Sequence, residues 1–185
     1  ANVLYFMFKT KKSHTAFFFV MIFLIILYVP LAQSYLMHCK DEELYKFIAT
    51  LPKSSVIAGF PTDMNCIALY GKRRPFIMSE LDIPHHADYY RQIKQRNSEF
   101  FMAYYSDNAE QLYQFCRKND VAYVVVNKEH FTKDFLNRHR VYTDPFNSFI
   151  KNITSSKKNF YLSNPKNIIF ESSNEIVVDC QKQYV

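Results

Sequence analysis

One short stretch holds the densest set of potential metal ligands in this sequence. It contains Asp82, His85, His86 and Asp88. Imidazole and carboxylate groups are ligands that zinc and other divalent ions accept. Adjacent His side chains diverge on a helix or a strand, however, and Pro84 is typical of a helix start. The sequence therefore favours helix capping by Asp82 or His85 over a metal site.

A basic run offers a different chemistry. Lys72, Arg73 and Arg74 follow one another directly. Their side chains suit a lipid phosphate or an anionic headgroup, because the planar guanidinium of arginine matches phosphate geometry. A run this short is also typical of a solvated entry into a strand. We expect phosphate contact if the run faces a membrane.

Aromatic side chains are frequent, with 18 Phe and 14 Tyr in 185 residues. One group of them could stack on the faces of sugar rings, but much of it has helical spacing, which favours packing in a core. The residues concerned are Tyr89, Tyr90, Phe100, Phe101, Tyr104 and Tyr105.

The four cysteines, Cys39, Cys66, Cys116 and Cys180, form no C-x-x-C pair, so the spacing of a zinc site is absent. Three disulfide pairings are open if they oxidise, and free buried thiols are an equally good interpretation. Cys116 lies on an apolar helix face without a recognisable His partner, which predicts a packed thiol and not a nucleophile. The sequence also holds no P-loop, G-x-S-x-G or H-E-x-x-H motif. We assign no catalytic residue, and we expect no cofactor in this chain.

The net charge of +6 is small and dispersed. Lys9, Lys11 and Lys12 lie near the N-terminus, so the chain beyond residue 36 carries 20 Lys and Arg against 17 Asp and Glu. This balance excludes the concentrated basic surface of a nucleic-acid-binding protein.

A long apolar segment precedes the rest of the chain. Residues 15–36 read TAFFFVMIFLIILYVPLAQSYL, without a charged side chain. A helix needs about 20 such residues to cross the hydrocarbon of a bilayer, whereas a core helix of this length would leave a face for water. The segment therefore predicts a transmembrane helix and a lipid bilayer as partner.

The first residues give this helix a context and an orientation. Residues 1–8, ANVLYFMF, resemble the end of a preceding transmembrane helix, and residues 9–14 form a basic loop. The positive-inside rule places that loop in the cytoplasm, so residues 37–185 are expected outside it. We expect a multi-pass protein of the cell membrane with an extracytoplasmic, periplasmic-type domain; a trimmed single-pass protein is the alternative.

Beyond residue 36 the pattern alternates between helices and strands. Strand, helix, strand, helices and strand in this order predict an α/β domain with a small, mostly parallel sheet flanked by helices. Two short strands at the end predict an antiparallel hairpin at the sheet edge. The expected helices are 41–51, 63–69, 86–105, 109–119, 133–138 and 145–153, and the expected strands 55–60, 75–78, 121–126, 167–170 and 175–178.

Several phrases in this order resemble a known family. A last transmembrane helix leads to LPKSSVIAGF, then to ALYGKRRPFIM, a long helix, and QFCRKNDVAYVVVNKEHF. This is similar to the extracytoplasmic C-terminal domain of membrane glycosyltransferases of the GT-C type, which take sugars from polyprenyl phosphates. The resemblance covers about residues 1–130. The chain contains no Trp, so it lacks the Trp-Trp-Asp signature of oligosaccharyltransferases.

The resemblance implies transfer of a sugar from a lipid-phosphate donor. It implies a catalytic acid in the first outer loop of the parent protein, near a divalent metal, and therefore outside this chain. The implied partners are the other transmembrane helices and a polyprenyl-phosphate sugar. In this interpretation the α/β domain caps the active site and helps to bind acceptor or donor. The alternative is a non-enzymatic, membrane-anchored module that binds a ligand or a partner.

Overall fold

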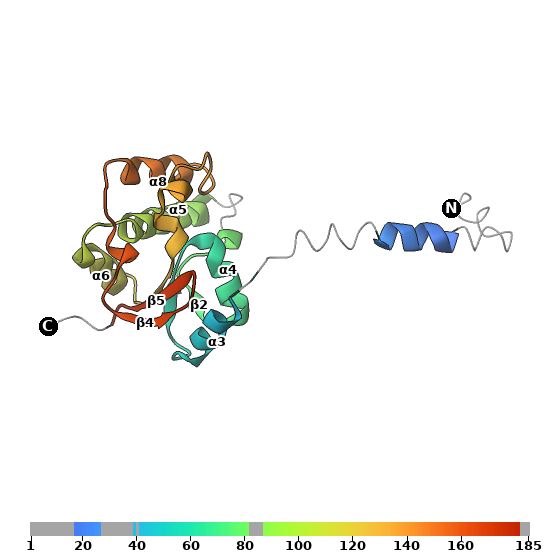
Figure 1. Cartoon of the computed structure of the whole chain (residues 1–185), viewed down its shortest axis with the longest axis horizontal. Helices are drawn as coiled ribbons and strands as arrows, with labels where there is room; N and C mark the ends of the chain where they lie inside the picture. The colour runs from blue at the N-terminus through green and yellow to red at the C-terminus, as the bar shows by residue number, and fades with distance from the viewer. Residues whose placement is uncertain (1–16, 27–38, 40, 82–86, 182–185) are drawn as a thin grey trace. The chain divides into compact units, whose positions relative to one another are not determined.

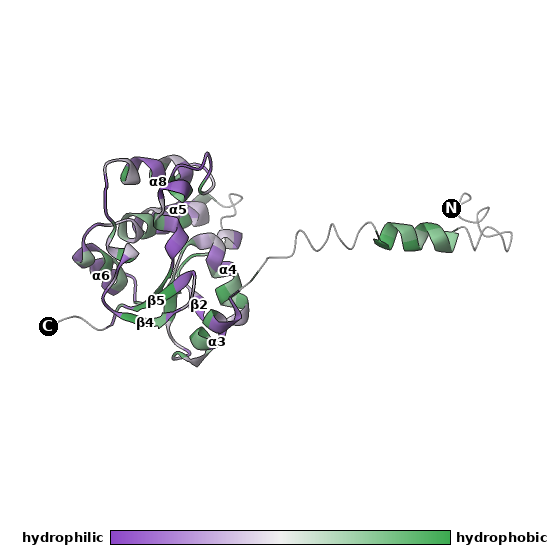
Figure 2. Cartoon of the chain, in the orientation of Figure 1, coloured by the Kyte–Doolittle hydropathy of each residue, from purple (hydrophilic) through white to green (hydrophobic). Residues whose placement is uncertain are grey.

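The computed structural model describes residues 17–26, 39, 41–81 and 87–181 and separates the chain into two units, Ala1–Lys40 and Asp41–Val185. In the first unit, residues 17–26 form an apolar helix (Figure 2) with exposed side chains from Phe18 onward. The remainder of the predicted transmembrane segment, the expected helix end at 1–8 and the basic loop lie outside the described residues. Among the helices that the structure describes, none is long and apolar enough to cross a membrane.

The second unit is a mixed α/β domain with helices on both faces of a five-stranded sheet (Figure 1). Its elements are α3 (Glu42–Thr50), β1 (Val56–Ala58), α4 (Pro61–Tyr70), β2 (Arg74–Pro75), η1 (Ser79–Leu81), α5 (Ala87–Tyr104), α6 (Ala109–Lys118), β3 (Val121–Asn127), η2 (Lys128–Phe131), α7 (Lys133–Leu136), α8 (Phe146–Ser155), η3 (Tyr161–Ser163), β4 (Ile168–Glu171) and β5 (Glu175–Asp179).

The sheet has the order β2-β1-β3-β5-β4. The pairs β1–β2 and β1–β3 are parallel, whereas β3–β5 and β4–β5 are antiparallel, so the prediction of a mostly parallel sheet is wrong. The predicted C-terminal hairpin is present. Its second strand, β5, lies inside the sheet, where Ile176 to Asp179 are all buried. Every residue of its first strand, β4, is partly or fully exposed. The buried strand of the hairpin is the one that lies next to β3.

Two hydrophobic clusters hold the layers together. One face of the sheet packs against α5, α6 and α8, with Phe101, Leu112 and Ile150 among the buried contacts. The other face packs against α3 and α4 through residues such as Ile48 and Ile67. Figure 1 shows these helices on opposite sides of the sheet. Because strand side chains alternate, β1 and β3 supply residues to both clusters, which explains their uniformly apolar sequences.

Some helices of the domain begin at a side-chain cap, whereas α4 and α8 do not. Asp41 and Asn108 cap α3 and α6 through their side chains, at the starts of the helices expected over 41–51 and 109–119. The helix expected over 63–69 starts earlier than predicted, because α4 begins at Pro61 and places Asp63 in its first turn. Proline suits the first helical position, since its fixed φ angle fits the helix and its missing N–H would have no partner there.

The two glycines lie where a side chain would collide with neighbours. A methyl group on Gly71 would lie 2.7 Å from the carbonyl oxygen of Ile67 and 2.7 Å from Cγ2 of Ile48. Gly71→Ala is therefore expected to lower the free energy of unfolding by about 1–3 kcal/mol, since the backbone of α4 must shift. Denaturant unfolding followed by circular dichroism measures this loss.

Gly59→Ala is the matched control. Its added methyl group meets Sδ of Met64 at 2.6 Å, at the end of a flexible side chain that can move. We expect a smaller loss than for Gly71→Ala. Equal losses would show that the α4 backbone yields as readily as a methionine side chain.

Candidate functional site

The carboxyl ends of the three parallel strands lie at the same edge of the sheet, which is where open α/β sheets bind ligands. Thr62 and Asp63 follow β1 in the first turn of α4, and Ser79 follows β2 at the start of η1. His130 follows β3 in η2. The topology therefore gathers two hydroxyl groups, a carboxyl group and an imidazole from segments far apart in the sequence.

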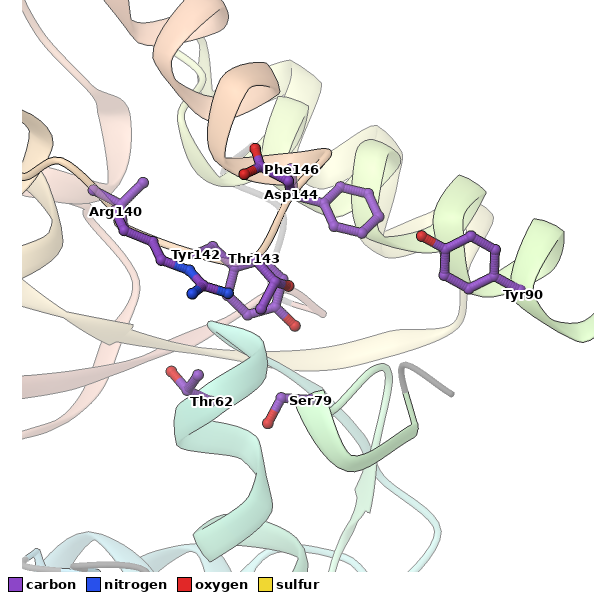
Figure 3. A pocket seen from close by; sticks show the side chains of 9 residues that line it. Thr62, Ser79, Tyr90, Arg140, Tyr142, Thr143, Asp144 and Phe146 are labelled. Atoms are coloured by element: carbon purple, nitrogen blue, oxygen red, sulfur yellow. The ribbon is translucent and has the colours of Figure 1, made fainter. Parts of the chain in front are cut away.

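A cleft of about 600 Å³ opens at this edge. Thr62 and Ser79 lie on one side of it, and the segment 140–146 lies on the other, with Tyr90 of α5 alongside (Figure 3). The lining residues are Thr62, Ser79, Tyr90, Arg140, Val141, Tyr142, Thr143, Asp144 and Phe146.

Aromatic packing fixes one wall of the cleft. Tyr142 and Phe146 are buried, and the ring of Tyr142 lies 5.6 Å from the rings of both Phe60 and Phe101. These edge-to-face contacts anchor the segment 140–146 on the core. The loop that forms this wall of the cleft is therefore already ordered. Binding of a ligand should cost little conformational entropy in the loop.

The polar groups of the cleft suit a ligand with hydroxyl and anionic groups. Arg140 is exposed and turned toward the cleft (Figure 3), and its guanidinium can donate two parallel hydrogen bonds to a phosphate or carboxylate. The hydroxyl groups of Thr62, Ser79 and Thr143 can donate and accept hydrogen bonds. The half-buried ring of Tyr90 offers an apolar face of the kind on which sugar rings stack.

A buried histidine, His130, lies beneath the carboxyl ends of the parallel strands. His130 is 5% exposed and lies between the rings of Phe60 and Phe135, at centroid distances of 4.3 Å and 4.4 Å. Burial lowers the pKa of His130 to about 3, so the imidazole is neutral near pH 7. Its Nδ1 lies 3.2 Å from the hydroxyl oxygen of Tyr104, which itself accepts a hydrogen bond from the backbone N–H of Asn127. Tyr104 can therefore donate to Nδ1, which ties η2 to α5.

Two carboxyl groups near this edge have raised pKa values. Burial raises the pKa of Asp63 to about 6, and Nε2 of His130 lies 3.9 Å from Oδ2 of Asp63. Burial, with repulsion from Asp63 and Asp41, raises the pKa of Glu175 to about 8. Such displaced pKa values gather at functional sites, but buried structural clusters produce them as well. Here they identify an acidic cluster with a marked pH response.

The predicted metal ligands are only partly described. Asp82, His85 and His86 lie outside the described residues, whereas Asp88 is exposed and paired with Arg91 at 3.2 Å. Within residues 41–81 and 87–181, no group of three or more His, Cys, Asp or Glu side chains is placed to hold a metal ion.

The basic run separates into two kinds of residue. Lys72 and Arg74 are exposed, but Arg73 is 8% exposed. The guanidinium of Arg73 donates to the carbonyl oxygens of Ala49 and Leu51 at the C-terminus of α3. It also donates to those of Gly71 and Lys72. Phosphate contact stays a prediction for Lys72 and Arg74, while the donors of Arg73 are occupied in holding the fold.

The aromatic group divides in the same way. Phe100, Phe101, Tyr104 and Tyr105 are buried in the main cluster, which confirms the prediction of core packing. Tyr90 instead lines the cleft, where its ring remains available to a ligand.

The cysteines are in two different states. Cys39 and Cys66 are disulfide-bonded, whereas Cys116 and Cys180 are buried free thiols. The prediction of a packed, unreactive thiol holds for Cys116, which is 2% exposed.

Arg140, Tyr142 and His130 were not among the residues predicted from the sequence to act in a site. A signal was present for His130, since the polar run Asn127–His130 directly follows the most apolar strand and must lie at its carboxyl end. No comparable signal marks the segment 140–146, because it becomes a wall of the cleft only through packing on Phe60 and Phe101.

No protein-family model and no curated protein matches the chain. Among solved structures, it is similar to the C-terminal globular domain of oligosaccharyltransferase from Archaeoglobus fulgidus, at 12% sequence identity and a TM-score of 0.45. The match covers 75% of this chain and 94% of that chain. Likeness at this level assigns the chain to no family.

Proposed function

We propose that the chain is the C-terminal part of a membrane glycosyltransferase-like protein that uses a polyprenyl-phosphate sugar. Its α/β domain binds the acceptor or the lipid-linked donor in the cleft and caps an active site formed by the rest of the protein. The observation that carries the proposal is the cleft itself. It combines Arg140, for a phosphate, with hydroxyl groups and the Tyr90 ring, for a sugar.

Two further features support an extracytoplasmic position beside a membrane. The uncharged segment 15–36 has the length and composition of a transmembrane helix. The basic loop before it is of the kind found on the cytoplasmic side, which favours an extracytoplasmic position for the residues that follow the helix. Cys39 and Cys66 are disulfide-bonded, and disulfides persist mainly in oxidising compartments. A reporter enzyme that works only outside the cytoplasm, fused after Val185, tests this orientation; activity of a cytoplasmic reporter there would overturn it.

Arg140→Gln tests the cleft. Charge-assisted hydrogen bonds contribute about 1.5–3 kcal/mol, so loss of the guanidinium is expected to weaken binding at least tenfold. The measurement is the affinity of the full chain, in lipid nanodiscs, for a polyprenyl-phosphate monosaccharide. The free polyprenyl phosphate serves as the second ligand, because it separates phosphate binding from sugar binding.

Arg117→Gln is the matched control, since Arg117 is an exposed arginine of α6 that pairs with Glu110 and does not line the cleft. It should bind both ligands as the unchanged chain does. Equal affinities for the Arg140 and Arg117 variants would contradict lipid-phosphate binding in the cleft. Absence of binding by the unchanged chain would instead favour the membrane-anchored binding module.

A further inference from the structure

Two buried cysteines meet at the end of the sheet opposite the cleft. The Sγ atoms of Cys116 and Cys180 lie 2.7 Å apart, and the two residues are separated by 64 positions in the sequence. Cys116 is near the C-terminus of α6, and Cys180 directly follows β5. A disulfide bond is about 2.05 Å long, so small changes of side-chain torsion bring the two sulfur atoms to bonding distance.

The surroundings hold both sulfur atoms in register. The backbone N–H of Cys180 donates to the carbonyl oxygen of Ala122 at 3.0 Å, which fixes the residue against the beginning of β3. Cys116 is held by α6, which packs on the same strand through the main hydrophobic cluster. A small cavity of about 200 Å³ borders both cysteines. The two side chains are therefore preorganised for each other and are not a chance surface contact.

We propose that Cys116 and Cys180 are oxidised to a disulfide that links α6 to the end of β5 in the extracytoplasmic domain. The oxidant is a small or protein-borne disulfide. One cysteine sulfur attacks it and forms a mixed disulfide, with release of the first thiol. The second cysteine sulfur then displaces the remaining thiol. The two cysteine sulfurs lose two electrons in total, the reagent's S–S bond accepts them, and both protons leave on its two thiols.

The bond acts as a structural brace and not as a redox catalyst. The neighbouring thiol and burial both raise the pKa of Cys180, so the reactive thiolate is scarce in the folded domain. The bond therefore forms as the chain folds, before α6 packs against the sheet, and exchanges slowly afterwards. It braces the edge at which β3 begins and β5 ends, and the cleft at the other edge keeps its geometry.

Peptide mapping tests the proposal on the full chain. The protein is exported to an oxidising compartment or refolded with oxidised glutathione, then denatured in iodoacetamide, which caps free thiols. Trypsin cuts after Arg96, Arg117, Lys166 and Lys182. We expect peptides 97–117 and 167–182 to be recovered joined, and to separate after reduction. In Cys116→Ser the peptide 167–182 should carry a capped thiol.

Stability gives a second measurement. The disulfide would close a loop of 64 residues in the unfolded chain. The equilibrium constant for unfolding is therefore expected to be about 10³-fold smaller than in the double variant Cys116→Ala, Cys180→Ala. The double variant retains Cys39 and Cys66, so their contribution cancels. Binding by the cleft should be the same with and without the bond. Recovery of both thiols in capped form from the oxidised, folded chain would overturn the proposal, whether or not the double variant folds and whatever the cleft binds.

Discussion

Replacing Arg73 with methionine is expected to lower the free energy of unfolding by about 3–5 kcal/mol, because it leaves several carbonyl oxygens without donors. Each buried polar group without a partner costs about 1–3 kcal/mol. Arg73 donates to the carbonyl oxygens of Ala49, Leu51 and Lys72, and Ala49 and Leu51 belong to the last turn of α3 and its C-cap.

The same contacts explain why a cation is required there. The C-terminus of a helix carries a partial negative charge from its unpaired carbonyl groups, and α3 has no basic residue in its own last turn. Arg73 supplies this charge from the entry to β2, 22 residues further along the chain. It thereby joins α3 to the parallel edge of the sheet.

Arg74→Met is the control, because Arg74 is the exposed neighbour in the same run. It should change the free energy of unfolding by about 0.5 kcal/mol or less. Arg73→Lys should fall between the two, since one ammonium cannot reach all the carbonyl oxygens that a guanidinium fork reaches. Denaturant unfolding ranks the three variants. Similar free energies of unfolding for Arg73→Met and Arg74→Met would contradict this role. They would show that water can hydrogen-bond to the carbonyl oxygens at the end of α3 as well as Arg73 does.

Replacing Glu175 with glutamine is expected to stabilise the domain by about 3 kcal/mol at pH 8.5. One carboxyl oxygen of Glu175, Oε2, is buried and has no hydrogen-bond partner among the described residues. Burial is the main cause that raises the pKa of Glu175 from 4.5 to about 8, and Asp63 and Asp41 add repulsion. Each pKa unit corresponds to about 1.4 kcal/mol, and the partial exposure of the side chain reduces the total from its upper limit of about 5 kcal/mol.

The sign follows from proton binding. Between pH 4.5 and 8 the folded Glu175 keeps a proton that the unfolded residue releases, so stability falls as the pH rises through this window. Asp63 acts in the same direction, but only between about pH 4 and 6. His130 acts oppositely, since its lowered pKa reduces stability as the pH falls from 6.5 toward 3. Glu175 therefore makes the largest contribution in the range from pH 6.5 to 8.5.

Denaturant unfolding at pH 6.5 and 8.5 measures the effect. The unchanged chain should lose about 1 kcal/mol between these pH values, after the same reduction for partial exposure, and Glu175→Gln should lose much less. Glu171→Gln, on the other strand of the same hairpin, is exposed and paired with Lys128, so it should keep the loss of the unchanged chain. If Glu175→Gln kept the full alkaline loss, another group would be responsible for it.

Local sequence signals predicted the elements of this domain well. Asp41 and Asn108 mark helix starts by side-chain capping, and the uniform apolar run of β3 predicted a strand covered on both faces. Capping depends on residues that are neighbours in the sequence, and strand burial depends on the pattern of apolar residues. Both can therefore be predicted from a single sequence.

The sheet order and the cleft depend on contacts between distant segments, which explains why they were missed. The insertion of β5 between β3 and β4 follows from the relative burial of two strands with similar sequences. The role of Arg73 could not be predicted for the same reason. The three basic residues of this run differ in function only through the distant groups that each side chain contacts in the folded domain. Arg140 joins Thr62 and Ser79 in one cleft although 78 and 61 positions separate it from them in the sequence.

The position of β5 has a consequence for how the domain is made. β5 is the last strand along the described chain, yet it joins β3 to β4 in the sheet. During synthesis, β3 must wait with one long, apolar edge open until residues 175–179 emerge and pair with it. An open edge of this kind recruits other strands, so a stalled or truncated chain is prone to aggregate. The pairing of β5 is thus the step at which β3 loses its open edge and the nascent domain is no longer exposed to misassembly through that strand.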